Sequence, residues 1–455
     1  MSQDLSSIKT ALASTITEPQ AGEDRGTQQH GHVPPSPEKR KRFSIRTFRS
    51  LKYRDYRILW ISILFMSAGQ WMEHIALNWL VYQMTDSALM LGAINGARAI
   101  PFLIVGPWAG VAADRFDRKK LMWMSQAYVM VLTAAIAGLI ISGYIQVWHL
   151  FAFTFLNAMG WSVTQPVRQT LVPNLVPKEE LINAVALQSA GFNSTRVLGP
   201  AAAGLIIGFA GPGWAFAAKA IMYLAILVLV FFLKVPPTPS TARETSATSN
   251  FKEGFKYIWG NQAVFSLIIL ALVPILIAFP AQSLMPIFAR DVLGFGPEGY
   301  GVMLSVAGIG ALAGTLGVAS LGGFRFKGRL LMGACIALGV SLILFALASW
   351  LPTLWENYGL ARSGSLILMV FVGGFQMIYM SLNNTLLHLN ITDDMRGRVM
   401  SIYMLDQGMA PLGSLLAGVA ADSFGAPLTV VAAGILCLLL AIFAMFRMPI
   451  VRRLT

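Results

Sequence analysis

Charged residues and cysteines are both scarce in this sequence. Only 12% of its 455 residues are charged, whereas 56% are hydrophobic. Its two cysteines, Cys335 and Cys437, lie within apolar runs, so neither a disulfide framework nor a cysteine metal site is predicted. The sequence also lacks a phosphate-binding loop, a cluster of metal-ligating residues and a convincing Ser/His/Asp set. We therefore predict neither an enzyme nor a protein that carries a metal or a cofactor.

Apolar runs dominate the chain instead. Many separate stretches reach about 20 residues, which is the length that an α-helix needs to cross a bilayer. The first run follows a long polar segment, so we expect no cleavable signal peptide. The sequence predicts an all-α integral membrane protein with twelve transmembrane helices, near residues 57–82, 89–113, 119–142, 147–171, 180–209, 212–233, 259–289, 298–322, 329–350, 361–389, 397–421 and 425–447.

Acidic residues are fewer than basic ones, and the formal net charge of +13 reflects membrane topology. About 29 of the 34 Lys and Arg residues fall in alternate connections or near the two ends of the chain. Because positively charged segments stay in the cytoplasm, both termini are predicted to be cytoplasmic. We expect the basic run from Lys39 through Arg57 to rest on anionic membrane lipid, and we expect no nucleic-acid partner.

Polar segments divide the chain into five predicted regions. Residues 1–50 are polar and charged, and they are predicted to form a disordered basic cytoplasmic tail. Two six-helix bundles are predicted at residues 51–234 and 258–449. A cytoplasmic linker rich in Pro, Ser and Thr joins them at 235–257, and a short cytoplasmic tail follows at 450–455.

An internal repeat relates the two bundles. The segment from Gly92 through Met122 aligns without gaps on the segment from Gly301 through Leu331. The second half is therefore predicted to be a diverged copy of the first in the same orientation. Parallel halves related by an axis along the membrane normal leave a central cavity between them.

The connection after the second predicted span concentrates charge. Asp114 ends one predicted helix while Arg118 begins the next, which suits a latch between two moving bundles. We predict that Asp114 caps or pairs with the N-terminus of the eleventh span near Arg396 and Arg398, and that it holds the cytoplasmic side closed. An ordinary positive-inside loop is the alternative. The whole connection reads Gly110-Val-Ala-Ala-Asp114-Arg115-Phe-Asp117-Arg118-Lys119-Lys120.

Charged side chains inside apolar spans need a reason, because each costs about 2.5–3.5 kcal/mol at mid-membrane. Glu73 is the one carboxylate well inside the first six predicted spans, and Arg98 is predicted to lie at the same depth in the next helix. These two residues fit either a site that couples protons to substrate or a structural ion pair. Nearby polar candidates for a cavity are Gln70, His74 and Asn78, and we expect His74 to be packed and hydrogen-bonded.

The fifth predicted span combines small residues with a charge. Gly199 and Gly204 allow close helix approach, and Pro200 permits a bend between them. Arg196 lies beside this bend and needs a partner, for which Asp406 and the substrate are candidates. Asp406 is the corresponding lone carboxylate of the second half, where a coupling role, a local cap and a contact between halves are all open.

Several of these segments resemble a known family. The Gly110 connection resembles the signature loop between helices 2 and 3 of the major facilitator superfamily, and the segment around Gly199-Pro200 resembles its antiporter motif. Over about residues 50–450 the chain is similar to one bacterial branch, which contains enterobactin-type siderophore exporters and macrolide efflux proteins. The segments that carry this similarity are Trp79–Ser87, Arg98–Pro101, Val172–Pro177 and Asp394–Val399.

The resemblance implies a fold and a function. It implies the major facilitator fold, alternating access, and proton-coupled export of amphipathic small molecules, of the siderophore or macrolide and drug type. It also implies a monomer in the bacterial inner membrane. Two alternatives are a proton-coupled importer on the same fold and a membrane protein without transport activity, such as a receptor or assembly partner. The Gly199-Pro200 span argues against the importer, and the Glu73 and Arg98 pair argues against the second alternative.

Overall fold

The computed structural model describes most of the chain between Arg46 and Leu454, and every regular element in these ranges is a helix. The described residues are 46–101, 104–105, 117–234, 247–321, 324–349, 358–403 and 406–454. Residues from Thr47 onward form one compact unit. Residues 1–45 of the predicted disordered tail and most of the Gly110 connection lie outside the described residues, whereas the last five residues of this tail, 46–50, are helical and belong to η1 (Arg46–Lys52).

The described part of the first half consists of helices, and local sequence signals mark the ends of several of them. Asp86 in the left-handed conformation (φ 48°) ends α1, and the Asp117 side chain accepts a 2.7 Å bond from the Lys120 amide to cap α4. Gly211, with φ 90°, connects α6 to α7. The elements are η1 (Arg46–Lys52), α1 (Arg54–Thr85), α2 (Ala88–Gly96), α4 (Arg118–Ile141), α5 (Val147–Leu175), η2 (Lys178–Glu180), α6 (Leu181–Ala210) and α7 (Pro212–Phe231).

The second half begins with a helix in the linker region and a span broken by prolines. Proline lacks the amide that continues an α-helix, and turns of π-helix start at Pro274 and soon after Pro286. The elements are α8 (Ala247–Gly260), α9 (Gln262–Val273), η3 (Pro274–Ala278), α10 (Pro280–Ser283), α11 (Met285–Ile287), η4 (Phe288–Val292), α12 (Pro297–Ser320), α13 (Lys327–Ala348), α15 (Tyr358–Asn390), α16 (Arg396–Tyr403), α17 (Asp406–Phe424), α18 (Ala426–Arg447) and α19 (Pro449–Arg453).

Within the described ranges, seven helices are long and apolar enough to cross a membrane by length and composition alone. They are Arg118–Ile141, Pro212–Phe231, Gln262–Val292, Pro297–Ser320, Lys327–Ala348, Gly359–Asn390 and Ala426–Arg447. The structure has helical residues in each of the twelve predicted ranges. The twelve-span count and the five region boundaries remain predictions.

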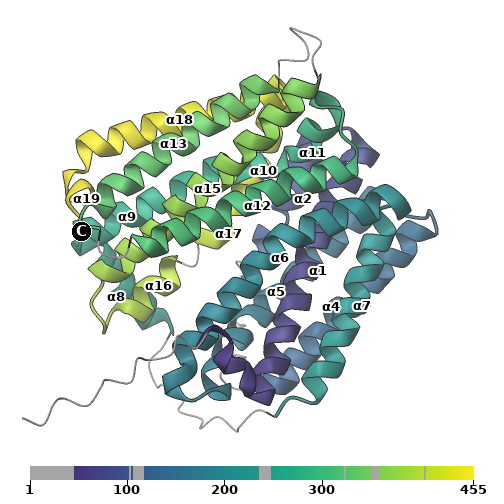
Figure 1. Cartoon of the computed structure of the whole chain (residues 1–455), viewed down its shortest axis with the longest axis horizontal. Coiled ribbons are helices and arrows are strands. Elements are labelled where there is room, and N and C mark those ends of the chain that lie inside the picture. The colour runs from purple at the N-terminus through teal and green to yellow at the C-terminus, as the bar shows by residue number, and fades with distance from the viewer. Residues whose placement is uncertain are drawn as a thin grey trace, which may run out of the picture. The chain divides into compact units, whose positions relative to one another are not determined.

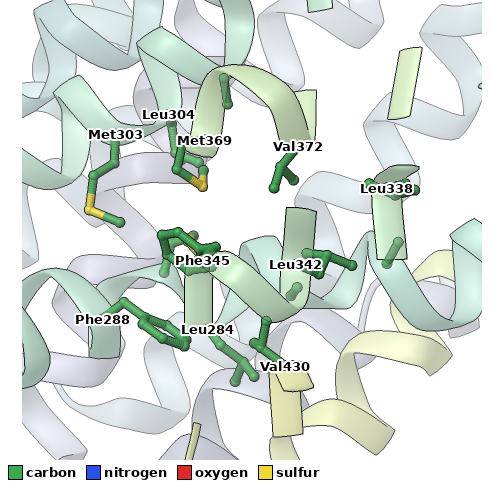
Figure 2. Close-up of a cluster of buried hydrophobic side chains, with 14 of the residues drawn as sticks. Leu284, Phe288, Met303, Leu304, Leu338, Leu342, Phe345, Met369, Val372 and Val430 are labelled. Atoms are coloured by element: carbon green, nitrogen blue, oxygen red, sulfur yellow. The ribbon is translucent and has the colours of Figure 1, made fainter. Parts of the chain in front are cut away.

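The helices of each half pack on one another, as the grouping of purple-to-teal and green-to-yellow ribbons shows (Figure 1). In the first half α1 packs on α6 and α7, and α4 packs on α5 and α7. In the second half α12 packs on α15, and α13 packs on α15 and α18. Apolar side chains fill this second half, with the ring of Phe288 centred 5.0 Å from that of Phe345 (Figure 2).

Two glycine-lined crossings join the halves: α2 crosses α17, and α12 crosses α6. A Cβ atom on Gly92 would lie 2.7 Å from the Cα of Gly418, and one on Gly301 would lie 2.9 Å from the Cα of Gly204. Such backbone contact requires glycine, and small residues commonly allow it between membrane helices. Since α2 and α12 occupy equivalent places in the predicted repeat, the second predicted span of each half crosses the fifth predicted span of the other.

These crossings lie toward one side of the helices. We call it the far side, where α1 and η4 end, and we call the opposite side, where α1 and α9 begin, the linker side. On the far side Tyr82 donates a hydrogen bond to Asp291, and Arg290 forms an ion pair with Asp86. On the linker side, pairs such as Arg398 with Glu253, at 2.5 Å, join residues outside the first half. The charge distribution predicts that the linker side is cytoplasmic.

Candidate functional site

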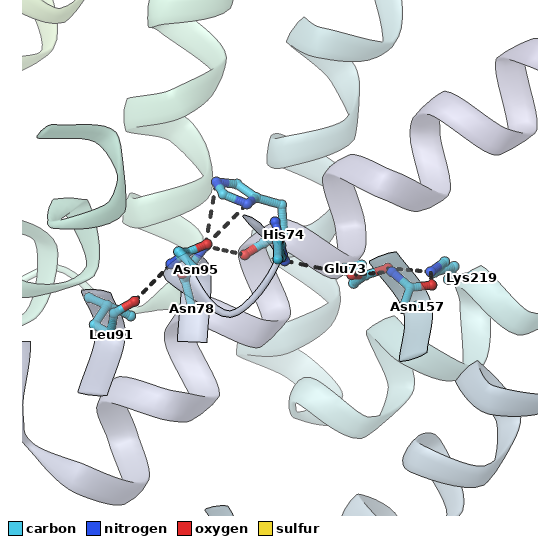
Figure 3. A network of polar contacts seen from close by, with 8 residues as sticks. Glu73, His74, Asn78, Leu91, Asn95, Asn157 and Lys219 are labelled. Atoms are coloured by element: carbon cyan, nitrogen blue, oxygen red, sulfur yellow. Dashed lines mark hydrogen bonds and ion pairs between the residues drawn. The ribbon is translucent and has the colours of Figure 1, made fainter. Parts of the chain in front are cut away.

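A buried carboxylate lies at the centre of the first half. Glu73, on α1, is only 5% exposed. It forms an ion pair with Lys219 of α7, and Asn157 of α5 donates its side-chain amide to both carboxylate oxygens, at 2.9 and 3.1 Å (Figure 3). Three helices far apart in sequence therefore meet at one charged group.

The methylene chain of Lys219 passes close beside Gly69 on its way to Glu73, where the glycine leaves room for it. A Cβ atom on Gly69, one helical turn before Glu73, would lie 3.1 Å from Cγ of Lys219. The ammonium also lies 5.0 Å from the centre of the Tyr223 ring and 5.7 Å from that of Phe153, so aromatic faces add to its stabilisation. The lysine is 1% exposed, and it is stable there because the carboxylate accompanies it.

Arg98 supplies a second cation on the same carboxylate. It follows the end of α2 at Gly96, and its Nη2 lies 3.7 Å from Oε1 of Glu73. That distance is an ion pair but is too long for a hydrogen bond, and this buried Nη2 has no hydrogen-bond partner. Glu73 and Arg98 thus meet as the sequence predicted, although Lys219 is the closer partner.

A separate polar chain runs along another face of α1. The side-chain amide of Asn78 lies 3.3 Å from Nδ1 of His74, and Asn95 of α2 donates a 2.6 Å bond to Asn78 (Figure 3). His74 also meets the ring of Trp71 edge-on, with centroids 6.1 Å apart. Asn78 is therefore part of the polar chain that contains His74 and is not part of the group around Glu73. Gln70 is half-buried on the same helix.

Arg196 lies in the middle of α6, next to the crossing with α12. It is 8% exposed, its guanidinium carbon lies 5.9 Å from the centre of the Trp71 ring, and Nη1 lies 3.5 Å from the sulfur of Met377. Neither contact neutralises its charge. Asp406 is the first residue of α17, but its side chain lies outside the described residues, so its predicted pairing with Arg196 stays a prediction.

The antiporter-like segment places its small residues on two different faces of α6. A Cβ atom on Gly199 would lie 2.7 Å from Cβ of Trp71 in α1. One on Gly204 would lie 2.7 Å from the Pro297 carbonyl oxygen of α12. Pro200, inside the helix, presents its carbonyl oxygen to Gly301 of the other half. The segment therefore packs α6 against its own half and against the partner half at once.

The predicted latch is described only in part. Gly110, Asp114 and Arg115 lie outside the described residues. Arg118 is the first residue of α4, as predicted for the start of this helix. At the eleventh span, Arg396 pairs with Asp393 at 2.7 Å, and Arg398 pairs with Glu253 of α8 at 2.5 Å. A contact of Asp114 with this helix stays a prediction.

Sequence reasoning missed two members of the Glu73 group, Lys219 and Asn157. The sequence did contain a signal for Lys219. A lysine inside the apolar run Pro212–Phe231 is costly in the membrane, as Glu73 is, and therefore predicts a partner or a function. Asn157 carried no comparable signal, because a single amide in an apolar span is common. Across the described residues, no group of three or more His, Cys, Asp or Glu side chains is placed to hold a metal ion.

The arrangement of helices is similar to that of solved transporter structures. A bacterial homologue of the lysosomal transporter Spinster, inward-facing and unoccupied, gives a TM-score of 0.69 at 13% identity, covering 88% of this chain and 98% of that one. An inward-facing bacterial homologue of the iron transporter ferroportin gives 0.68 at 15% identity, covering 86% and 98%. Likeness at this identity shows the fold alone. The class is a multi-pass membrane protein with the major facilitator fold.

The family follows from the sequence. Residues 45–453 match the family described as transmembrane secretion effector, and the chain belongs to this family of major facilitator transporters. The staphyloferrin A transporter of Staphylococcus aureus is 29% identical over 362 residues, which are 78% of this chain and 87% of the relative. The multidrug efflux pump Tap of Mycolicibacterium fortuitum is 27% identical over 398 residues, 85% of this chain and 94% of the relative.

Another relative is the macrolide efflux protein A of Streptococcus pyogenes, 23% identical over 391 residues that cover 82% of this chain and 92% of the relative. The predicted resemblance to siderophore and macrolide transporters is confirmed. The chain is thus a transporter of small molecules in the bacterial plasma membrane, and its family and relatives are not enzymes.

Proposed function

We propose that this protein is a proton-coupled exporter of amphipathic small molecules that works by alternating access. One observation carries the proposal: Glu73 is buried between two cations, Lys219 of α7 and Arg98 in the turn after α2. A carboxylate in such a place binds or releases a proton only with a large change in its surroundings. The export direction is supported by the Gly199-Pro200 segment and by the two efflux relatives named above.

In the proposed cycle, Glu73 alternates between a charged and a protonated form. The charged form holds Lys219 and Arg98, and therefore ties α1 to α7 and to the segment after α2. Protonation removes the negative charge, so both cations lose their partner and must find another or become hydrated. The proton gradient thereby changes the relative stability of two arrangements of the same helices.

The far-side contacts support the conformational part of the proposal. The Gly92–Gly418 and Gly301–Gly204 crossings and the hydrogen bond from Tyr82 to Asp291 join the two halves on the far side, which supports a state closed on that side. This is the arrangement that a carrier needs in order to accept a molecule from the linker side, which is predicted to be cytoplasmic. In the opposite arrangement the crossings separate, and Asp114 would hold the linker side closed.

Cellular retention of transported compounds tests the proposal. Wild type, Glu73→Gln and Lys219→Gln are expressed in a host without its own pumps, with matched controls Glu179→Gln and Lys252→Gln at exposed positions. The panel contains macrolides, cationic dyes and siderophores, with and without an uncoupler. We expect wild type and both controls to lower retention of at least one compound, and both the uncoupler and the two site variants to abolish that effect. Uncoupler-resistant efflux would refute proton coupling.

A further inference from the structure

Among the described side chains, the layer of the membrane domain around Glu73 contains more positive than negative charge. Among the side chains that the structure describes there, Lys219, Arg98 and Arg196 are cations and Glu73 is the single carboxylate. Glu73 already has two cations beside it. Buried cations without a counter-ion are strongly unfavourable in a medium that water does not fill.

Arg98 and Arg196 lie at similar depth. Arg98 contacts α1 at Glu73, and Arg196 contacts α1 at Trp71. Two residues along an α-helix correspond to a rise of only about 3 Å. Both arginines also lie on segments that face the other half, because Gly96 of α2 approaches Leu415 and α6 crosses α12. Both arginines therefore lie on the side of the first half that faces the second half.

Neither guanidinium has its hydrogen-bonding capacity filled. Nη2 of Arg98 is buried without a hydrogen-bond partner. Nη1 of Arg196 meets the Met377 sulfur, which is a weak acceptor, and the Trp71 ring offers only a π face. A guanidinium matches the geometry of a carboxylate, because two parallel N–H groups reach both oxygens.

We propose that the transported molecule is an organic anion, and that its carboxylate groups are bound by Arg98 and Arg196 while its apolar part packs on Trp71. This inference rests on the proposed transport function and narrows its substrate class. It disfavours cationic compounds, because Lys219 and Asn157 already occupy the oxygens of Glu73 and two cations stand close by. A bound carboxylate would supply negative charge beside the two arginines, where Glu73 is the one carboxylate among the described side chains.

A matched set of fluorescent probes tests the charge preference directly. The probes are dansyl-glutamate, which has two carboxylates, its uncharged diamide, and the cation dansyl-cadaverine. Binding is measured on the purified full chain in nanodiscs of zwitterionic lipid, with empty nanodiscs as a blank. We expect dansyl-glutamate to bind at least about tenfold more tightly than the diamide, since each charge-assisted hydrogen bond contributes about that factor or more.

The variants assign the preference to the two arginines. We expect Arg196→Gln and Arg98→Gln each to reduce the preference about tenfold, and Arg196→Lys, which keeps the charge, to retain part of it. Arg447→Gln, at an exposed position at the end of α18, is the matched control and is expected to behave as wild type. Size-exclusion chromatography checks that each variant is folded.

Three results would overturn the inference: equal binding of dansyl-glutamate and its diamide, tighter binding of dansyl-cadaverine, or no binding of any probe at millimolar concentration. An unchanged preference in both arginine variants would overturn the assignment of the site as well. Because binding is measured without a gradient, it is independent of the retention assay. Carboxylate binding without any effect on cellular retention would leave this site in place and refute the exporter proposal.

Discussion

Lys219→Met would keep a long flexible side chain in the space beside Gly69 while removing the ammonium that holds Glu73. The carboxylate would keep Asn157 and would have Arg98 at 3.7 Å as its remaining cation. Removing one partner of a buried ion pair usually costs about 3–5 kcal/mol, because the other charge is left uncompensated. A unit charge at the Arg98 distance offsets part of this, since its attraction is about 4 kcal/mol at an effective dielectric constant of about 20.

We therefore expect Lys219→Met to lower the free energy of unfolding in mixed detergent micelles by about 2–3 kcal/mol, which is at or below the lower end of that range because Arg98 remains as a partner. Glu73→Gln alone leaves the cations without an anion and should cost a similar amount. The double variant removes both charges, so it should be more stable than the sum of the two effects predicts, with a coupling energy of about 1–3 kcal/mol. Transport should be absent in all three variants, because the titrating carboxylate or its partner is gone.

Comparing the two single variants with the double variant in a double-mutant cycle can also refute the coupling of Glu73 with Lys219. Effects that add to within about 0.5 kcal/mol would mean that Glu73 and Lys219 are not energetically coupled. In that case Arg98 would be the effective partner of Glu73, and the same cycle with Arg98→Met should show the coupling. Proton-driven efflux that survives in the double variant would refute the role of this pair in transport.

Three further predictions concern closure of the far side, the predicted latch at Asp114 and the cap of α4. Gly92→Val should prevent closure of the far side, because even its Cβ would lie 2.6 Å from the Ser414 carbonyl oxygen. The reporter substitution Ser87→Cys should then react faster with an impermeant maleimide. Gly138→Val is the control, because open space surrounds Gly138, and it should not change the reaction rate. Asp114→Asn should abolish efflux while membrane insertion, measured by surface-accessible tags, stays normal, and unchanged efflux would contradict the latch. Asp117→Ala should lower the free energy of unfolding by about 1 kcal/mol through loss of the α4 cap, and a loss below a few tenths would show that the cap is not needed.

Local sequence patterns determined much of the architecture. Apolar runs predicted where helices form, since a membrane helix must satisfy its own backbone hydrogen bonds. The charged Asp117-Arg118 segment marked the start of α4, and the position of Glu73 inside a span marked it as exceptional. The hairpin between the first two spans also placed Arg98 at the depth of Glu73, because both positions are fixed by distance from the same turn.

The choice of partners was decided by tertiary structure. Lys219 is 146 residues from Glu73, and the sequence alone gives no register between α1 and α7. The repeat predicted parallel halves, but only packing shows that Gly92 meets Gly418 while Arg196 is left between Trp71 and Met377. Hydropathy and helix ends are local properties that each segment carries with it. Which charges are paired depends on rotations and crossings of helices, and these are set only when all the side chains pack together.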